Sequence, residues 1–305
     1  MAEDAVGFIG LGLIGAPLAR VLRSRGTPLV VNNRTAEKAG KVLEEGAVWA
    51  ASPEVVGRES TSGIVFLCLA HAEACSNALW KKGGLVRGLP KGGLVVNLST
   101  IAPDEARELE RRLGESGLHY AEAPIGGSID AAAQGQVLFY AGGSPSDLDR
   151  AQPYLERMGK KVLRMGPVGA GTAMKIVNNI LTIGTVTLLS ESLALAEGLG
   201  LDLRTTVEIL LEGGGRSQML LNKQEAFLKK DYTPKFFVTL AEKDLRLAER
   251  SARLTGKKVR MVREARRLLE EAEALGLGES DFSAAYEAAR SRGRRGPRSR
   301  IPIPL

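Results

Sequence analysis

The sequence has few residues with which to bind a metal ion or form disulfides. Its 305 residues include only two cysteines and two histidines. Cys68 and Cys75 have no metal-ligand spacing to a histidine or to each other, so we expect no metal site. Two free thiols fit a reducing compartment such as the cytoplasm. Neither His71 nor His119 lies beside a plausible nucleophile, and we predict structural roles for both.

Long apolar runs and an export signal are also missing. The longest apolar run, ILTIGTVTLLS, has eleven residues, whereas about 20 are needed to cross a bilayer. The N-terminus, MAEDAVGFIGLG, has no basic flank and no cleavage signature, because glycines interrupt its apolar run at once. We therefore expect a cytoplasmic protein without a membrane partner, in which the apolar run forms a core helix.

Outside the C-terminus the sequence has almost no excess of positive charge, although the formal charge of the whole chain is +7. Without the six arginines of the last sixteen residues, the charge is +1. A short basic end after the last helix is usually solvated rather than a nucleic-acid site. Nucleic acid is therefore an unlikely partner. The six residues are Arg290, Arg292, Arg294, Arg295, Arg298 and Arg300.

Short apolar runs alternate with helical patterns in the first half of the chain. The runs AVGFIG, TPLVVNN, SGIVFLCLA and GGLVVNLST have the composition of buried strands, and the segments between them have polar faces. This alternation is typical of a parallel sheet in an α/β fold. Three shorter strands are predicted further along, in GLHYAEAP, GQVLFYAGG and KVLRMG.

Strand patterns end after the segment MGPVGAG. One long helix is predicted from Thr172 to about Leu199, and further helices follow to about Arg290. We place a domain boundary near Gly166 and Pro167. The predicted organisation is a dinucleotide-binding domain (residues 1–166), an all-helical domain for substrate binding and oligomerisation (167–290) and a basic tail (291–305).

A glycine-rich turn links the first predicted strand to the first predicted helix. Gly10, Gly12 and Gly15 have the Gly-x-Gly-x-x-Gly spacing of a dinucleotide-binding turn. Gly10 would form the tight turn, Gly12 would let backbone amides approach a pyrophosphate, and Gly15 would let the helix pack on the sheet. The helix N-terminus also favours an anion. With Leu13 and Ile14, these glycines are the predicted cofactor-binding turn; the alternative is a purely structural glycine turn.

The end of the second predicted strand indicates which dinucleotide binds. An NAD site normally has Asp or Glu here for the ribose hydroxyls, but this sequence has VVNNRT. Asn33, Arg34 and Thr35 supply hydrogen-bond donors and a cation, which suit the 2′-phosphate of NADP. We therefore predict NADP, with NAD less favoured. The alternative is that Arg34 is an ordinary surface residue at a helix start.

Polar residues recur along the long predicted helix, in GAGTAMKIVNNILTIG. Residues three and four apart share a helix face, so Lys175, Asn178, Asn179 and Thr182 form one polar stripe. Burial near a domain junction would lower the lysine pKa toward neutral pH and suit the side chain for proton transfer. An exposed lysine without a role in catalysis is the alternative. Neither interpretation is favoured by these residues alone.

Five blocks of sequence resemble those of the β-hydroxyacid dehydrogenase family, which includes 3-hydroxyisobutyrate dehydrogenase, tartronate semialdehyde reductase and the glyoxylate and succinic semialdehyde reductases. The blocks have the family's order and spacing, and the resemblance extends to about residue 290. It implies a Rossmann-type, doubly wound N-terminal domain followed by an all-α domain. The blocks are FIGLGLIGAPLA, VVNLSTIAP, AEAPIGGSIDAAAQGQVLFYAGG, GAGTAMKIVNN and DYTPKFFVTLAEKDLRLA.

The resemblance also implies roles for individual residues. Lys175 matches the catalytic lysine of the family, and Asn179 matches the asparagine that binds substrate. Ser99 matches a substrate-binding residue. Phe236 is expected to line the site, and Asp244 is expected to be structural. On the cofactor side, the matching positions are Leu69, Ala70, Thr100 and Lys243.

One departure from the family concerns the loop that holds the substrate carboxylate. The usual Ala-Pro-Val-Ser-Gly-Gly is replaced by Ala-Pro-Ile-Gly-Gly-Ser, so that Gly126 stands at the position of the serine. Backbone amides of Gly126 and Gly127 can still hold an anion. We therefore expect Gly126, Gly127 and Ser128 to bind the carboxylate.

The expected reaction is reversible hydride transfer between NADP(H) and a small 3-hydroxy acid or semialdehyde, with Lys175 as general acid and base. The apolar segment LLSESLALAEGLGL and the resemblance predict a homo-dimer or tetramer. An imine reductase-like enzyme and a non-catalytic dinucleotide-binding scaffold are the alternatives. Lys175 argues against both, because imine reductases usually replace the lysine and such scaffolds tend to lose it.

Overall fold

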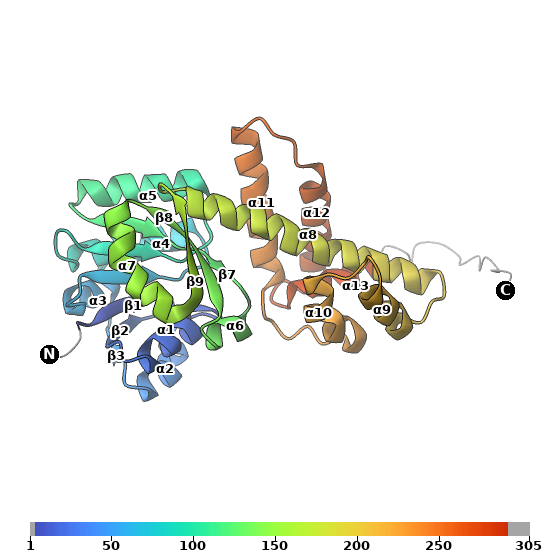
Figure 1. Cartoon of the computed structure of the whole chain (residues 1–305), viewed down its shortest axis with the longest axis horizontal. Coiled ribbons are helices and arrows are strands. Elements are labelled where there is room, and N and C mark those ends of the chain that lie inside the picture. The colour runs from blue at the N-terminus through green and yellow to red at the C-terminus, as the bar shows by residue number, and fades with distance from the viewer. Residues whose placement is uncertain (1–3, 292–305) are drawn as a thin grey trace. The chain divides into compact units, whose positions relative to one another are not determined.

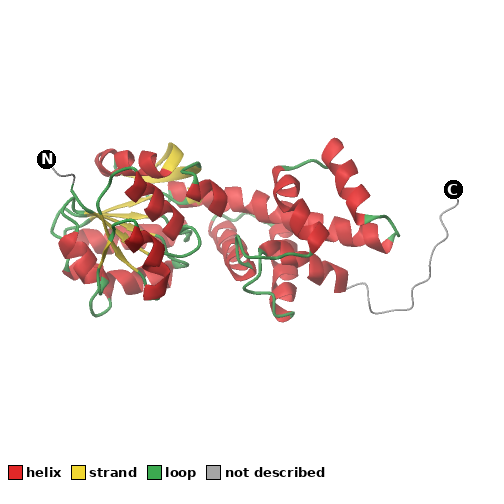
Figure 2. Cartoon of the chain, turned by 90° about the horizontal axis from the view of Figure 1, so that it is seen from below, coloured by secondary structure: helices red, strands yellow, loops and turns green. Residues whose placement is uncertain are grey.

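The computed structural model describes residues 4–291. The chain divides into two units, Met1–Asn178 and Asn179–Leu305, and the division falls inside one long helix. The predicted basic tail lies outside the described residues, apart from its first residue. All strands of the described residues belong to the first unit, and the second unit is built from helices (Figure 2). The predicted fold class is confirmed.

The first unit contains one twisted sheet whose strand order is β3-β2-β1-β4-β5-β6-β8-β7, with β9 paired to β8 (Figure 1). The pairs from β3 to β6 are parallel, whereas β8 runs antiparallel to β6 and β7. The strands are β1 (Val6–Ile9), β2 (Leu29–Asn32), β3 (Val48–Trp49), β4 (Ile64–Leu67), β5 (Leu94–Asn97), β6 (His119–Glu122), β7 (Ile125–Gly126), β8 (Val137–Gly143) and β9 (Gly159–Gly166).

Helices cover both faces of this sheet, because the central strands are apolar on both sides. One apolar cluster joins the sheet to α1, α2 and α7, and a second joins it to α3, α4 and α5. The helices of this unit are α1 (Gly15–Ser24), α2 (Gly40–Glu44), α3 (Pro53–Glu59), α4 (Ala72–Trp80), α5 (Pro103–Glu115), α6 (Ile129–Ala133) and α7 (Pro145–Met158), with 3₁₀ turns η1 (Ala36–Ala39) and η2 (Leu85–Arg87).

All seven predicted strands are present. The very short β3 and β7 were not predicted, since two residues carry no recognisable alternation. Strand β1 has β2 on one side and β4 on the other, which is the switch point of a doubly wound sheet. Ligands of such folds bind outside the carboxyl ends of the strands at this point.

The second unit is an assembly of helices with its own buried residues, including Val207, Phe227, Leu245 and Tyr286. It contains the end of α8 (Ala170–Gly198), which begins two residues before the predicted helix start. The others are α9 (Leu203–Glu212), α10 (Gln218–Lys229), α11 (Val238–Leu254), α12 (Arg260–Ala274), η3 (Phe282–Ala284) and α13 (Ala285–Ser291).

By length and composition, α8 alone among the described helices could cross a membrane. However, 44% of its most apolar window is buried inside the protein. Helices of globular proteins pass the same test. The expected core helix is thus buried along only part of its surface, and leucines such as Leu181 are exposed.

Candidate active site

The turn between β1 and α1 needs glycine at two positions, because backbone atoms leave no room there for a side chain. Gly10 has φ +103°, and a Cβ added to it would lie 2.2 Å from the carbonyl oxygen of Cys68. A Cβ on Gly15 would lie 2.0 Å from the carbonyl oxygen of Gly10. By contrast, the space beside Gly12 is open for 4 Å. The chain therefore forms a narrow turn at the switch point, with open space above its middle glycine and the N-terminus of α1 behind it, and this shape fits a pyrophosphate.

Asn33 connects this turn to the end of β2. Its side-chain oxygen accepts a hydrogen bond from the backbone N–H of Leu11 at 2.9 Å, and its amide donates to the carbonyl of Thr35 at 2.8 Å. Arg34 and Thr35 are exposed next to it. Both polar groups of the Asn33 amide therefore bond to the backbone and fix the loop. The exposed guanidinium of Arg34 places a positive charge at the end of β2.

The ends of β4 and β5 are tied together by Ser99. This residue is only 3% exposed, and its hydroxyl accepts a hydrogen bond of 2.8 Å from the backbone N–H of Leu69. Asn97 accepts from the Ser99 N–H at 3.0 Å. Thr100 is half-buried, and Ala70 is exposed. The Ser99 hydroxyl thus holds two loops of the cofactor side in register, in addition to the substrate role predicted for it.

The cysteines and histidines of the described chain have local structural contacts. Burial raises the pKa of the Cys68 thiol to about 12. His71 caps α4, where its Nδ1 accepts from the N–H of Ala74 at 3.1 Å, and His119 lies 3.0 Å from Asp147. Within residues 4–291, no group of three or more His, Cys, Asp or Glu side chains could hold a metal ion.

The predicted carboxylate loop follows β6 and contains β7. Gly126 is buried, while Gly127, with φ +148°, and Ser128 are exposed. The Ser128 hydroxyl caps α6 by accepting from the N–H of Ala131 at 3.1 Å. A hydroxyl also carries one donor, so this capping bond leaves the proton of Ser128 for another partner.

Lys175 and Asn179 lie four residues apart on α8, and the burial around them is unusual for a helix. Asn179 is only 3% exposed, whereas Val177 and Leu181 are 52% and 70% exposed. Lys175 is half-buried. The polar stripe of α8 is therefore not its solvent face. An asparagine buried in preference to valine and leucine needs polar partners, because burying an unpaired amide is costly.

Asp244 of α11 is the partner of the Asn179 side chain. The Asn179 amide donates to the Asp244 carboxylate at 2.5 Å, and the ammonium of Lys243 lies 2.9 Å from the other carboxylate oxygen. Asp244 itself is 3% exposed. One buried carboxylate thus fixes two residues of the predicted site, which the sequence had assigned to separate roles.

Glu122, at the end of β6, holds the first turn of α8. Its carboxylate accepts hydrogen bonds from the backbone N–H groups of Gly169 and Thr172 at 2.9 and 3.0 Å. The Thr172 hydroxyl donates to the same carboxylate at 3.2 Å. Glu122 is fully buried, and this burial raises its pKa despite the hydrogen bonds. The helix that carries Lys175 therefore begins on a fixed point of the sheet.

Phe236 precedes α11 in a segment anchored by Asp281. The Phe236 ring is half-buried against Phe282, with ring centroids 5.3 Å apart. Asp281 accepts from the Phe236 N–H at 3.2 Å and from the ammonium of Lys223 at 2.8 Å. The backbone that carries Phe236 is thus held by a buried ion pair.

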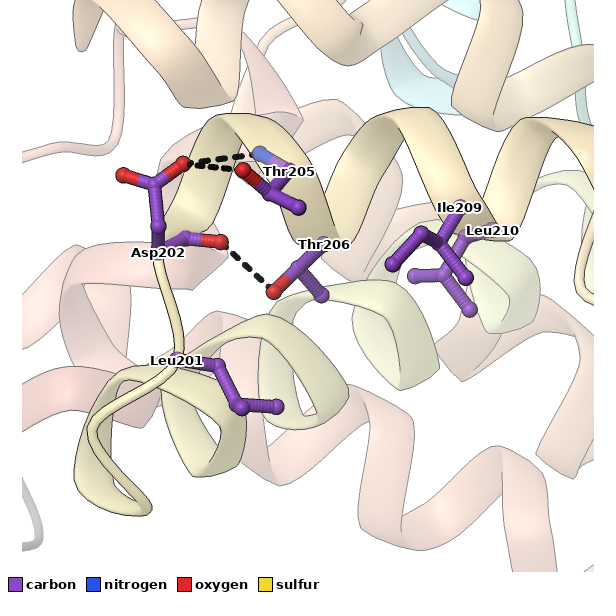
Figure 3. Close-up of a pocket in the computed structure, with 6 residues that line it drawn as sticks. All are labelled: Leu201, Asp202, Thr205, Thr206, Ile209 and Leu210. Carbon is purple, nitrogen blue, oxygen red and sulfur yellow. Dashed lines mark hydrogen bonds between the residues drawn. The ribbon is translucent and has the colours of Figure 1, made fainter. Parts of the chain in front are cut away.

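A hollow of about 340 Å³ lies elsewhere in the second unit, beside the start of α9 (Figure 3). Asp202 is used there as a helix cap, accepting from the N–H and hydroxyl of Thr205 at 2.8 Å each. The other lining residues are Leu201, Thr206, Ile209 and Leu210. None of the predicted site residues is among those that line this hollow. Its apolar wall comes from Leu201, Ile209 and Leu210.

Sequence reasoning missed the bonds of Glu122 to the start of α8 and of the Tyr140 hydroxyl to Asn178. It expected Asp244 to be structural, but did not identify Asn179 as its partner. Each acts through a partner far along the chain, between 38 and 65 residues away. The available signal was Glu122 itself, a charged residue that ends an apolar strand run. No comparable local signal marks Tyr140.

Two family models together match almost the whole described chain. The NAD binding domain of 6-phosphogluconate dehydrogenase matches residues 5–166. The model described as NAD-binding of NADP-dependent 3-hydroxyisobutyrate dehydrogenase matches residues 169–289. The chain belongs to the β-hydroxyacid dehydrogenase family. It is therefore an oxidoreductase with NAD(P)-binding domains, as the resemblance implied.

Individual relatives agree with this family. The chloroplastic glyoxylate/succinic semialdehyde reductase 2 of Arabidopsis thaliana is 31% identical over 94% of this chain and 80% of the relative. The 3-sulfolactaldehyde reductase of Escherichia coli is 29% identical, over 94% and 96%. Among solved structures, 3-hydroxyisobutyrate dehydrogenase from Salmonella typhimurium superposes with a TM-score of 0.85 at 27% identity, covering 93% of this chain and 99% of the other. Hydroxyacid or semialdehyde dehydrogenase activity is the reaction class common to these proteins.

Proposed function

We propose that the protein reduces a small semialdehyde to its hydroxy acid, a 3-hydroxy acid or a homologue with a shorter or longer chain, and catalyses the reverse oxidation, with NADP(H) as cofactor. The observation that carries this proposal is the polar face of α8, where Lys175 and the buried Asn179 lie one turn apart. When bound, the cofactor supplies or accepts the hydride at the carbon that bears the hydroxyl. The turn of Gly10, Gly12 and Gly15 would hold its pyrophosphate, together with Leu13 and Ile14.

Lys175 is the general acid in the reducing direction. Its ammonium gives one proton to the carbonyl oxygen as that carbon gains the hydride, and the neutral amine takes the proton back in the oxidation. Asn179 orients the same oxygen, since Asp244 holds its amide in one position. Gly126, Gly127 and Ser128 hold the carboxylate, and Phe236 and Ser99 border the substrate.

NADP is preferred over NAD in this proposal. Arg34 is exposed at the end of β2, and no acidic side chain stands at residues 33–35, where the hydroxyls of NAD would need one. Thr35 adds a hydroxyl. Leu69, Ala70 and Thr100, at the ends of β4 and β5, and Lys243 complete the proposed cofactor contacts.

The proposed organisation is that of the sequence prediction: a cytoplasmic enzyme with a cofactor domain of residues 1–166, a helical domain of 167–290 and a basic tail of 291–305. It would assemble as a dimer or tetramer. Its partner would be a carboxylate-bearing small molecule.

A panel of small semialdehydes tests the function. Oxidation of NADPH and of NADH would be followed with glyoxylate, succinic semialdehyde and methylmalonate semialdehyde. We expect turnover with at least one of them and a higher kcat/KM for NADPH than for NADH. Arg34→Asp should reverse that preference, with Arg58→Asp, a surface arginine on α3, as control. Absence of turnover with every semialdehyde would refute the proposed reaction, and an equal kcat/KM for NADH would refute the cofactor preference alone.

A further inference from the structure

The hydroxyl of Tyr140 occupies the place where residue 126 would carry a side chain. Strands β7 and β8 are antiparallel, with Gly126 opposite Leu138, and Tyr140 follows two residues later on β8. A Cβ added to Gly126 would lie 2.5 Å from the Tyr140 hydroxyl oxygen and 2.9 Å from the ring carbon that bears it. Both distances are shorter than real Cβ contacts. A side chain at position 126 therefore requires the Tyr140 side chain to move.

The backbone of Gly126 does not require glycine. The φ angle of Gly126 is not positive, whereas its neighbour Gly127 has φ +148°. A serine or alanine at position 126 would thus meet no strain in its own backbone. The close approach of Tyr140, rather than the backbone conformation, is the obstacle to a side chain at this position.

The single proton of the Tyr140 hydroxyl makes only a long hydrogen bond. The hydroxyl donates to the side-chain oxygen of Asn178 at 3.4 Å, which is long for a bond between two oxygens. A phenol has one donor and two acceptor positions. Tyr140 is only 6% exposed, and burial raises its pKa, so that the hydroxyl keeps its proton at neutral pH. The neutral Tyr140 hydroxyl therefore lies next to Gly126 on one side and to Asn178 of α8 on the other. Asn178 follows Lys175 by three residues.

We propose that Tyr140 is a specificity-determining residue whose hydroxyl donates a hydrogen bond to the substrate carboxylate beside Gly126 and Gly127. The inference rests on the function proposed above, in which this loop holds the carboxylate. To donate to the carboxylate, the hydroxyl turns its one proton away from Asn178, whose 3.4 Å bond it gives up. Tyr140 then adds a side-chain donor to the backbone groups of the loop. A hydrogen bond to a charged group contributes more to binding than one between neutral groups, so this donor favours substrates with an anionic end.

Tyr140→Phe removes the hydroxyl and keeps the ring. We expect KM for succinic semialdehyde to rise about 10-fold, with kcat and the NADPH dissociation constant nearly unchanged. For butanal, which has the same chain length and no carboxylate, KM should not change. Tyr154→Phe, a change of a tyrosine on α7 in the same unit, is the matched control and should leave both substrates unaffected. Equal effects on the two aldehydes, or none, would overturn the inference.

A double-mutant cycle between positions 126 and 140 tests the steric relation without any substrate. Gly126→Ser alone should lower Tm, because its Cβ meets the tyrosine. Combined with Tyr140→Leu, the same serine should cost little stability, so the two changes should be strongly non-additive. The serine hydroxyl should also bring KM for succinic semialdehyde below that of Tyr140→Leu alone. Additive losses of Tm would overturn the steric half of the inference.

The two levels of the proposal fail in different ways. If the unaltered protein reduces no semialdehyde, the proposed function fails and the substrate role of Tyr140 fails with it, while the stability cycle still decides the steric relation. If the unaltered protein is active and Tyr140→Phe behaves like it toward both aldehydes, only the role of Tyr140 is refuted.

Discussion

At the scale of single residues, Asp244 determines how the side-chain amide of Asn179 is oriented, that is, where its NH₂ group and its oxygen point. A carboxylate only accepts hydrogen bonds, so Asn179 must turn its NH₂ group toward Asp244, as the 2.5 Å contact shows. The amide oxygen then points away from Asp244. An acceptor oriented in this way suits a substrate hydroxyl or the ammonium of a lysine. The buried carboxylate thus gives Asn179 a defined polarity.

Lys175→Ala tests the proposed proton transfer. We expect kcat to fall by roughly 10²–10⁴-fold, the usual loss for a general acid, while NADPH affinity changes little. Asn179→Ala should impair the same step less. The double variant should be far from additive, because residues that act as a unit do not contribute separately. Steady-state kinetics and fluorescence titration with NADPH measure both quantities.

Lys160→Ala, a change of an exposed lysine on β9, is the matched control and should retain full activity. A Lys175→Ala protein that binds NADPH normally and turns over at the unaltered rate would show that the polar stripe of α8 has no role in proton transfer.

Cys68 should be chemically inert in the native protein. Burial raises its pKa from the ordinary 9.0 to about 12, so at pH 9 its thiolate fraction is roughly 10²–10³-fold below that of an unfolded thiol. Because the shift comes from desolvation of the thiolate, the thiol does not affect stability below its unfolded pKa, and it lowers stability as the pH rises from 9.0 toward 12. We expect iodoacetamide at pH 9 to label Cys68 rapidly in urea and very slowly in the native state, as measured by mass spectrometry. Equal labelling rates in both states would contradict this expectation.

At the scale of elements, α8 is fixed at its start by the sheet, and further along by the bond of Asn179 to Asp244 of α11. Glu122 accepts the N–H groups of its first turn, and Gly171 lets that turn approach the backbone of Tyr140, since a Cβ there would lie 2.1 Å from the Tyr140 carbonyl oxygen. Helix N-termini leave unpaired donors that need such acceptors. The first turn of α8, and with it Lys175, is therefore rigidly placed in the first unit.

Glu122→Ala should loosen this start. Hydrogen–deuterium exchange should become faster in a peptide covering residues 169–175, and kcat should fall by about 10-fold or more because the lysine loses its fixed position. Glu122→Gln keeps one acceptor oxygen and should recover most of both properties. Ser144→Ala, which removes the cap of α7, serves as control and should leave that peptide and kcat unchanged. Unchanged exchange in Glu122→Ala would refute the anchoring role.

At the scale of the whole molecule, the second unit has more apolar surface than its own core covers. Leu181, Leu188 and Leu195 recur every seven residues along α8 and are 70%, 60% and 63% exposed. Leu201 and Ile209, beside the hollow at the start of α9 (Figure 3), are exposed as well. Leucines that repeat along a helix and stay exposed form an apolar row of the kind that packs against another surface. The proposed occupant is a second copy of the chain.

Sedimentation velocity at micromolar concentration should therefore give a dimer or a larger oligomer. Leu188→Glu with Leu195→Glu should shift the protein toward the 32.5 kDa monomer, because two buried charges would oppose the apolar contact. Leu254→Glu, at the end of α11 and 69% exposed, should leave the oligomer intact. A stable monomer of the unaltered chain would contradict the assembly.

The sequence alone determined the features that depend on local rules. The glycine-rich turn was predictable because the left-handed φ of Gly10 and the close contact of Gly15 leave no alternative to glycine. Strands β1, β2, β4 and β5 were predictable because buried parallel strands are continuously apolar, and α8 because its apolar pattern persists over eight turns. The five ordered blocks likewise sufficed for the family.

Only the tertiary structure decided which distant side chains serve as partners. Asp244 reaches Asn179 across 65 residues of sequence and Glu122 reaches the start of α8 across 47 to 50. Such contacts depend on how helices and strands pack, and the chemical pattern of neighbouring residues does not encode them. The same is true of Gly126: the sequence presented it as a lost serine, whereas the structure supplies the physical reason, a tyrosine hydroxyl from the next strand that already fills the space.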